Sequence, residues 1–172
     1  RKTNPIGIDF GRASLKMIQQ VAGESQYLAD KMAVPAEVQQ DSKAYSQWAG
    51  MAIKDMLART PFKGHLVRSS ICSGQIETCH LRLDKMDPEQ LDQVVKYEIQ
   101  SKISFSTENA MIRHILAGEI YDSRENTTKY EVIVLAISGK NLFHHVRCLE
   151  SCKLEIETIS VPVAVLPNAY SQ

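Results

Sequence analysis

The first part of the chain alternates apolar and polar residues in three short runs, a pattern typical of half-buried β-strands. Gly11 and Gly23 lie at or near the breaks between these runs, and Pro35 follows the third. The pattern predicts a meander of adjacent antiparallel strands. The predicted strands cover residues 6–10, 15–21 and 27–34.

The next segment has apolar residues three and four positions apart, as on one face of an amphipathic helix. We predict that the helix is capped by Asp41 or Ser42 and stops before Pro61. A strand is predicted over 65–73. The apolar positions of the helix are Tyr45, Trp48, Ala49, Ala52, Ile53, Met56 and Leu57.

One stripe of this helix allows two interpretations. Tyr45, Trp48, Met51 and Met56 form an apolar stripe at helical spacing. We interpret it as core. A partner groove is the alternative, since methionine and aromatic side chains suit adaptable apolar sites.

Beyond Gly74 the pattern predicts a second unit, in the order strand, helix, strand, strand, helix, strand. Asp87-Pro88-Glu89 marks the start of its first helix, with a capping residue, a proline in the first turn and an early acidic charge. The polar stretch 122–129 predicts a hairpin loop. The predicted strands are 76–83, 111–121, 130–137 and 154–161.

A last full helix is predicted after Gly139, with four apolar residues on its inner face. These are Leu142, Phe143, Val146 and Leu149. A further helical segment is predicted over 162–172. The chain shows no solenoid repeat or low-complexity tract.

Composition narrows the function classes. Lys+Arg and Asp+Glu both number 20, so the formal net charge is zero. Net charge therefore gives no reason to expect binding to nucleic acid or to an anionic membrane surface. No apolar run reaches the roughly 20 residues that span a bilayer. The four cysteines lack metal-type C-x2-C spacing, so we expect reduced, structural thiols and a cytoplasmic protein. Zinc binding by Cys148, Cys152 and His144 or His145 is a minor alternative.

The segment from Ile6 to Lys16 carries the candidate chemistry, because each polar residue suits a phosphate. Gly11 allows a sharp turn whose backbone amides can face an anion. Ser14 can donate a hydrogen bond, and Lys16 supplies a positive charge. Asp9 can hold a hydrated Mg²⁺. The alternative is a glycine hairpin that binds nothing.

Other catalytic signatures are not found in the sequence. The segment is neither a Walker A loop nor a dinucleotide fingerprint. No G-x-S-x-G or comparable triad accompanies the histidines, so we predict no catalytic residue. His114 is expected on an exposed or half-buried strand face. Glu89, Asp92, Lys96 and Glu98 are expected on a solvated helix face.

Several motifs together resemble the PilM family of type IV pilus assembly and, more distantly, FtsA. I-G-I-D-F-G-R-A-S-L-K is similar to the family's G-I-D-I-G-x-x-S-V-K. M-D-P-E-Q-L-D-Q-V-V-K-Y-E-I-Q-S-K-I-S-F is similar to its M-x-x-E-E-L-x-x-x-V-x-x-E-A-x-x-x-I-P-F. E-V-I-V-L-A-I-S-G-K-N-L and C-K-L-E-I-E-T-I-S-V-P resemble two later segments. The likeness covers nearly the whole chain.

The resemblance implies a fold and its division. We expect an α/β (α+β) protein with an actin-like, RNase H-like first subdomain and an inserted small subdomain of strand, helix, strand and strand. Residues 1–74 would begin the first subdomain, 75–138 would form the insert, and 139–172 would return to the first subdomain.

The resemblance also implies a role. We expect a cytoplasmic scaffold at the inner face of the bacterial inner membrane, which binds the N-terminal peptide of a PilN-like inner-membrane protein in a groove between the two subdomains. Self-association stays open. The phosphate motif implies that ATP contacts Asp9, Gly11, Arg12, Ala13, Ser14 and Lys16, with Mg²⁺ held through water at Asp9.

Departures from the family pattern leave alternatives. Ser104 stands where proline is common, Arg12 where a small residue is common, and Pro162 where an acid is common. Asp9-Phe10-Gly11 is the only D-x-G, whereas actin-like proteins place a second one in another lobe. We therefore expect weak or no ATP binding and no enzymatic activity from this chain alone. It would be a first-half fragment or a degenerate relative. An actin-like ATPase or sugar kinase completed by a second lobe, and a type II secretion scaffold, are the rival functions.

Overall fold

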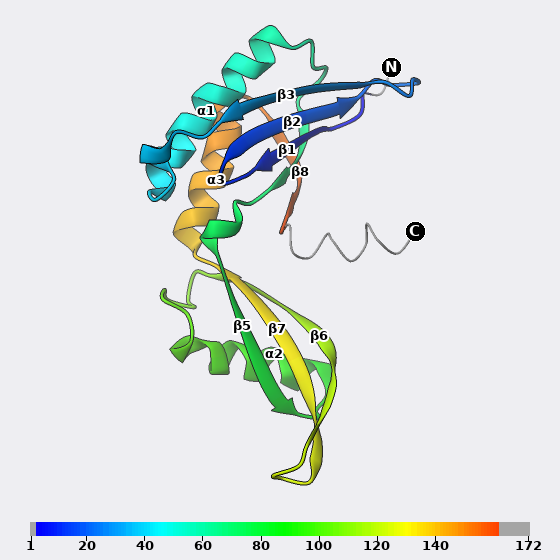
Figure 1. Cartoon of the computed structure of the whole chain (residues 1–172), viewed down its shortest axis with the longest axis vertical. Helices are drawn as coiled ribbons and strands as arrows, with labels where there is room; N and C mark the ends of the chain where they lie inside the picture. The colour runs from blue at the N-terminus through cyan, green and yellow to red at the C-terminus, as the bar shows by residue number, and fades with distance from the viewer. Residues whose placement is uncertain (1–2, 162–172) are drawn as a thin grey trace. The chain divides into compact units, whose positions relative to one another are not determined.

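The computed structural model describes residues 3–161. The chain forms two compact units, one of Arg1–Gln75 with Phe143–Gln172 and one of Ile76–Leu142. Figure 1 shows the path of the chain through both. The segment 162–172, predicted as helical, lies outside the described residues. Within residues 3–161, no helix combines the length and apolar character needed to cross a bilayer.

A five-stranded mixed sheet forms the centre of the first unit, in the order β3-β2-β1-β4-β8. The first three strands run antiparallel, which confirms the predicted meander, whereas β1, β4 and β8 are parallel neighbours. The strands are β1 (Ile6–Phe10), β2 (Ser14–Gln20), β3 (Tyr27–Ala33), β4 (Leu66–Ser70) and β8 (Glu155–Ser160).

Helices α1 (Ser42–Arg59) and α3 (Gly139–Ser151) lie along the same side of this sheet (Figure 1). The strands alternate accordingly: Ile6, Ile8 and Phe10 of β1 are buried, whereas the intervening residues are more exposed. The carboxylate of Asp41 accepts hydrogen bonds from two backbone N–H groups of the first turn of α1, which confirms one of the two predicted caps. The opposite face of the sheet stays more exposed, and the candidate site lies there.

The second unit is a three-stranded antiparallel sheet in the order β5-β7-β6. Its strands are β5 (Ile76–Asp84), β6 (Met111–Asp122) and β7 (Thr127–Ile137), and its helix is α2 (Pro88–Glu98). Alternate strand residues pack against the apolar stripe of α2. The core consists of Leu81, Leu83, Leu91, Val95, Ile99, Val132 and Val134. The mixed α+β class predicted from the sequence is confirmed.

Two predicted strand boundaries differ from the structure by three residues, and several others differ by one. The polar stretch 122–129 is not all loop, because β7 begins at Thr127 and pairs its first residues with the end of β6. Asn126, with φ of 54°, supplies the left-handed residue of a short turn. Strand β4 ends at Ser70, and Ser73–Gln75 forms a 3₁₀ turn in place of the predicted end of the strand.

The inner face of α3 was predicted in part wrongly. Phe143 is 61% exposed, whereas His145 and Cys148 are buried beside Leu149. These three residues keep helical spacing, so the stripe exists but is rotated. The predicted stripe did not include His145, whose burial depends on contacts with Ser69 and Phe10 elsewhere in the fold, whereas Cys148 was expected as a structural thiol and behaves as a small apolar residue. In α1 the core interpretation is likewise wrong for Met51, which is 66% exposed.

Candidate functional site

The turn between β1 and β2 requires glycine. A Cβ atom on Gly11 would lie 2.6 Å from the backbone oxygen of Ser14, closer than any side chain tolerates. The hydroxyl of Tyr45 donates to the carbonyl oxygen of Gly11 at 2.9 Å and so ties the turn to α1. Burial raises the pKa of Tyr45 above its usual value, which keeps this hydroxyl protonated as a donor.

Asp9 has two partners at the end of β1. The hydroxyl of Ser70 donates to Oδ1 at 2.7 Å, and Nζ of Lys16 lies 3.4 Å from Oδ2. The backbone N–H of Phe10 donates to the same serine hydroxyl at 3.3 Å. Lys16 faces Asp9 because the two residues are directly paired in the β1–β2 ladder.

The structure brings together only part of the predicted site. Asp9 and Lys16 are in contact, and Ser14 precedes Lys16 by two positions on β2, so both side chains lie on the same face. Arg12 and Ala13 are exposed at the turn. Among residues 3–161, neither Arg12 nor Ser14 makes a side-chain hydrogen bond to Asp9 or Lys16.

One row of polar side chains crosses the whole sheet. Register pairs Lys31 with Lys16, Lys16 with Asp9, Asp9 with Ser70, and Ser70 with Ser160. Two of these four pairings, Lys31 with Lys16 and Asp9 with Ser70, join a strand of the predicted motif to a strand outside it. The carboxyl ends of parallel strands are where open α/β sheets bind ligands, and Asp9 and Ser70 lie at such ends.

The row borders a hollow of about 860 Å³ on the exposed face of the sheet. Lys16, Lys31 and Arg68 line it together with Asp9 and Asp30, and much of the remaining lining is apolar, as at Ile18 and Ala29. Lys16 pairs with Asp9 and Arg68 with Glu157, so within residues 3–161 Lys31 is the cation of this lining that remains for an anion. Sequence reasoning missed Lys31, Ser70 and Ser160, because their place in the row depends on strand pairing and not on a local motif.

The donor set at Asp9 fits a hydrated Mg²⁺ better than a tightly bound metal. The carboxylate is half-exposed beside the hollow and offers one acidic group, as Mg²⁺ with mostly water ligands requires. In the described part of the chain, no three His, Cys, Asp or Glu side chains gather as a metal cluster. Burial raises the pKa of Cys148 to about 12, so its thiol stays protonated and is a poor zinc ligand.

A second polar pair is buried on the helix-covered face. Ser69 Oγ and His145 Nε2 lie 2.9 Å apart, and the imidazole packs against the ring of Phe10 with centroids 4.4 Å apart. Burial lowers the pKa of His145 to about 4. The cavity beside the pair measures about 10 Å³, which is room for one water at most. The pair is therefore a core contact.

Comparisons with known proteins identify the fold. No protein-family model and no curated protein sequence matches the chain. Among solved structures, a PilM-PilN type IV pilus biogenesis complex matches with a TM-score of 0.70 and 15% identity, over 98% of this chain and 51% of that one. The resemblance to PilM that the sequence motifs indicated is confirmed for the fold.

Two other structures match less closely. The cytoplasmic domain of EpsL, an inner-membrane component of the type II secretion system of Vibrio cholerae, gives a TM-score of 0.57 and 10% identity, covering 93% of this chain and 57% of that one. A Bacteroides thetaiotaomicron protein with an actin-like ATPase fold and unknown function gives a TM-score of 0.53 and 11% identity. That match covers 99% of this chain and 56% of the other. The chain thus has an actin-like fold and spans about half the length of each structure.

Proposed function

We propose that this chain is one lobe of a PilM-like scaffold in a type IV pilus or related secretion machine. The observation that supports the proposal is the match to PilM in a complex with PilN, which extends over 98% of the chain and so includes both compact units. On this proposal the protein works in the cytoplasm, at the inner face of the inner membrane, and reaches the membrane through its partner.

The proposed partner is the cytoplasmic N-terminal peptide of a PilN-like inner-membrane protein. Titration of a fluorescently labelled peptide of this kind, followed by anisotropy, tests the proposal. We expect saturable binding with a Kd below hundreds of micromolar, equivalent to more than about 5 kcal/mol of binding free energy. A peptide of scrambled sequence and equal charge is the control. Equal or absent binding of the two peptides would contradict a PilN-like partner.

We also propose that the Asp9–Lys16 segment is half of a nucleotide site, in which ATP phosphates contact the turn and Lys16. The assignment is supported by the Asp9 carboxylate, which is hydrogen-bonded to Ser70 and paired with Lys16 beside a hollow that Lys31 also lines. Bound Mg²⁺ would neutralise phosphate charge, while the chain itself would orient the phosphates with backbone and side-chain donors. Isothermal titration calorimetry with ATP and Mg²⁺ tests it, and Asp9→Ala should remove the magnesium-dependent part of the binding.

The rival functions differ in what the second lobe adds. An actin-like ATPase would require a second D-x-G hairpin and would hydrolyse ATP once both lobes are present. A type II secretion scaffold is favoured by the match to the EpsL cytoplasmic domain. A transmembrane segment further along the gene would favour that scaffold over a PilM-like protein.

A further inference from the structure

We infer that Lys31 is a second phosphate-binding cation, which acts beside Lys16 on a linear polyphosphate group. This inference rests on the proposed half-site and extends it to an edge strand, β3, that lies outside the Asp9–Lys16 motif. Four observations support it: strand register, the partners of the neighbouring charges, the anchoring of the backbone, and the hollow that both lysines line.

Strand register sets the two lysines side by side. Lys16 and Lys31 are directly opposite in the β2–β3 ladder, and both side chains are exposed on the face that carries Asp9. Like charges in directly opposite positions disfavour folding. Two adjacent cations do, however, produce a positive potential that attracts an anion. Asp9 offsets the charge of Lys16, so Lys31 adds positive charge on this face that an anion can meet.

The neighbouring charges leave Lys31 without a counter-ion. Lys16 lies beside Asp9, and Arg68 pairs with Glu157. Within residues 3–161, the ammonium group of Lys31 makes no ion pair or hydrogen bond. A polyanion over the hollow would meet this group without first having to displace a carboxylate.

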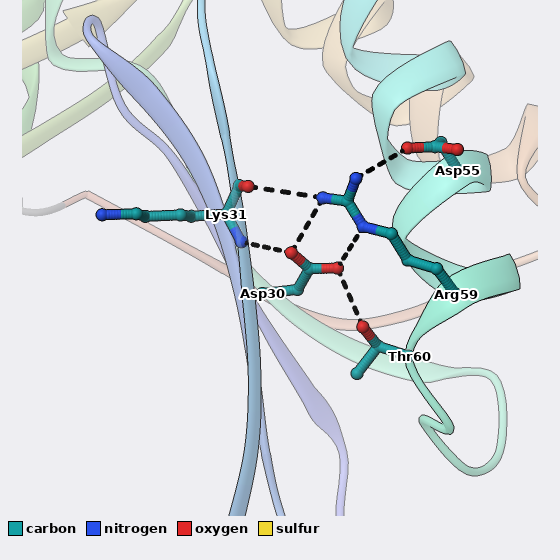
Figure 2. Close-up of polar contacts among 5 residues, drawn as sticks. All are labelled: Asp30, Lys31, Asp55, Arg59 and Thr60. Atoms are coloured by element: carbon teal, nitrogen blue, oxygen red, sulfur yellow. Dashed lines mark hydrogen bonds and ion pairs between the residues drawn. The ribbon is translucent and has the colours of Figure 1, made fainter.

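The carboxylate closest in sequence to Lys31 is already engaged on the other side of the strand. Asp30 accepts two hydrogen bonds from Arg59, at 2.7 and 2.8 Å, and one from the hydroxyl of Thr60 at 2.8 Å (Figure 2). The paired guanidinium lowers the pKa of Asp30 to about 2. Figure 2 shows the side chain of Lys31 extending away from this network.

The same network anchors the backbone from which Lys31 projects. Its N–H donates to Oδ1 of Asp30 at 2.7 Å, and its carbonyl oxygen accepts from Arg59 at 3.4 Å. Arg59 is itself held by Asp55 at 3.1 Å. A fixed backbone reduces the freedom that a binding residue loses when its ligand arrives. Lys31 is thus held at its Cα while its side chain stays free to reach a ligand.

Geometry favours a polyphosphate over a smaller anion. Neighbouring strands lie about 4.8 Å apart, so two long lysine side chains can converge on successive phosphoryl groups of one chain. Inorganic tripolyphosphate and the triphosphate of a nucleotide share this chemistry. The two sources are separated by comparing tripolyphosphate with ATP, since only ATP adds contacts from its nucleoside.

The test is calorimetric titration of the 172-residue chain with sodium tripolyphosphate, and separately with ATP and Mg²⁺, at low ionic strength where exposed charge pairs are least screened. We expect Lys31→Gln to raise the Kd for both ligands about fivefold. Lys63→Gln is the matched control, because Lys63 is an exposed lysine whose backbone bonds to Gln19 at the other end of β2. Thermal melting checks that each variant is folded.

The outcomes separate this inference from the half-site itself. If Lys16→Gln weakens binding while Lys31→Gln matches Lys63→Gln, Lys31 has no role and the half-site stands. If the unmodified chain binds neither tripolyphosphate nor ATP up to about 5 mM, the role of Lys31 is overturned, whereas the half-site stands, because weak or no ATP binding is expected of one lobe alone. Loss of affinity in both Lys16→Gln and Lys31→Gln, but not in Lys63→Gln, supports the two-lysine site.

Discussion

Replacing His145 with glutamine should remove most of the acid sensitivity that this core position gives the fold. The imidazole is 5% exposed, and burial lowers its pKa from 6.5 to about 4. The unfolded chain therefore takes up a proton near pH 6.5 that the folded chain takes up only near pH 4. The folded state is at full stability above pH 6.5 and loses stability as the pH falls from there toward 4.

The magnitude follows from the pKa difference. Each pH unit within this window lowers the free energy of unfolding by about 1.4 kcal/mol. At pH 5 the protonation of this one group in the unfolded chain therefore lowers it by about 2 kcal/mol. His145→Gln keeps an amide that can bond to the Ser69 hydroxyl but has no proton to gain. Between pH 7 and pH 5, the free energy of unfolding of the original chain should fall about 2 kcal/mol further than that of the variant.

Urea denaturation followed by circular dichroism at pH 5 and pH 7 measures the free energy of unfolding of the original chain and of His145→Gln. His65→Gln is the control, since His65 has an exposed side chain, and its pH dependence should follow that of the original chain. Parallel pH dependence of the original chain and His145→Gln would refute the reasoning. So would an imidazole resonance of His145 that titrates near pH 6.5 in the folded chain, a measurement that does not depend on the variant folding.

Two further predictions concern the ion-pair network and the hairpin turn. Arg59→Met should lower the urea midpoint above pH 3.8, and the difference should shrink as the pH falls toward 2. The reason is that the lowered pKa of Asp30 gives its full stabilisation above the pKa of the unfolded state and loses it as the pH falls through the pKa of the folded state. Urea denaturation across this pH range measures the difference, and a constant difference would contradict the prediction. Gly11→Ala should cost about 1–3 kcal/mol because its Cβ would meet the backbone oxygen of Ser14. Gly74→Ala, where nothing lies within 4 Å, is the control for the same denaturation measurement, and equal effects of the two would exclude the steric explanation.

Local signals in the sequence predicted the elements that depend on local structure. The alternation in β1, β2 and β3 and the glycine between the first two gave the meander, because a hairpin turn and its strands are encoded within a few residues. Pro88 marked the start of α2 correctly, although Asp87 makes no side-chain capping bond there. Interactions between residues close in sequence are enough to determine these features.

The remaining part of the candidate site depends on distant pairings. Ser70 reaches Asp9 across 61 positions of sequence, and Lys31 faces Lys16 because of the register between two strands. Neither residue belongs to a motif, so composition and spacing gave no reason to select it. The buried position of His145 was missed for a related reason, since its partner Ser69 lies on a strand 76 positions away.

The network around Asp30 also affects whether another chain can add a strand to the edge of the sheet. β3 is an outer strand of the five-stranded sheet, and outer strands offer unpaired backbone groups on which another chain can add a strand. At Lys31 both of these groups are occupied by side chains, the N–H by Asp30 and the carbonyl by Arg59. An incoming strand would find its hydrogen-bond ladder interrupted there. The same contacts thus protect the molecule against edge-to-edge aggregation.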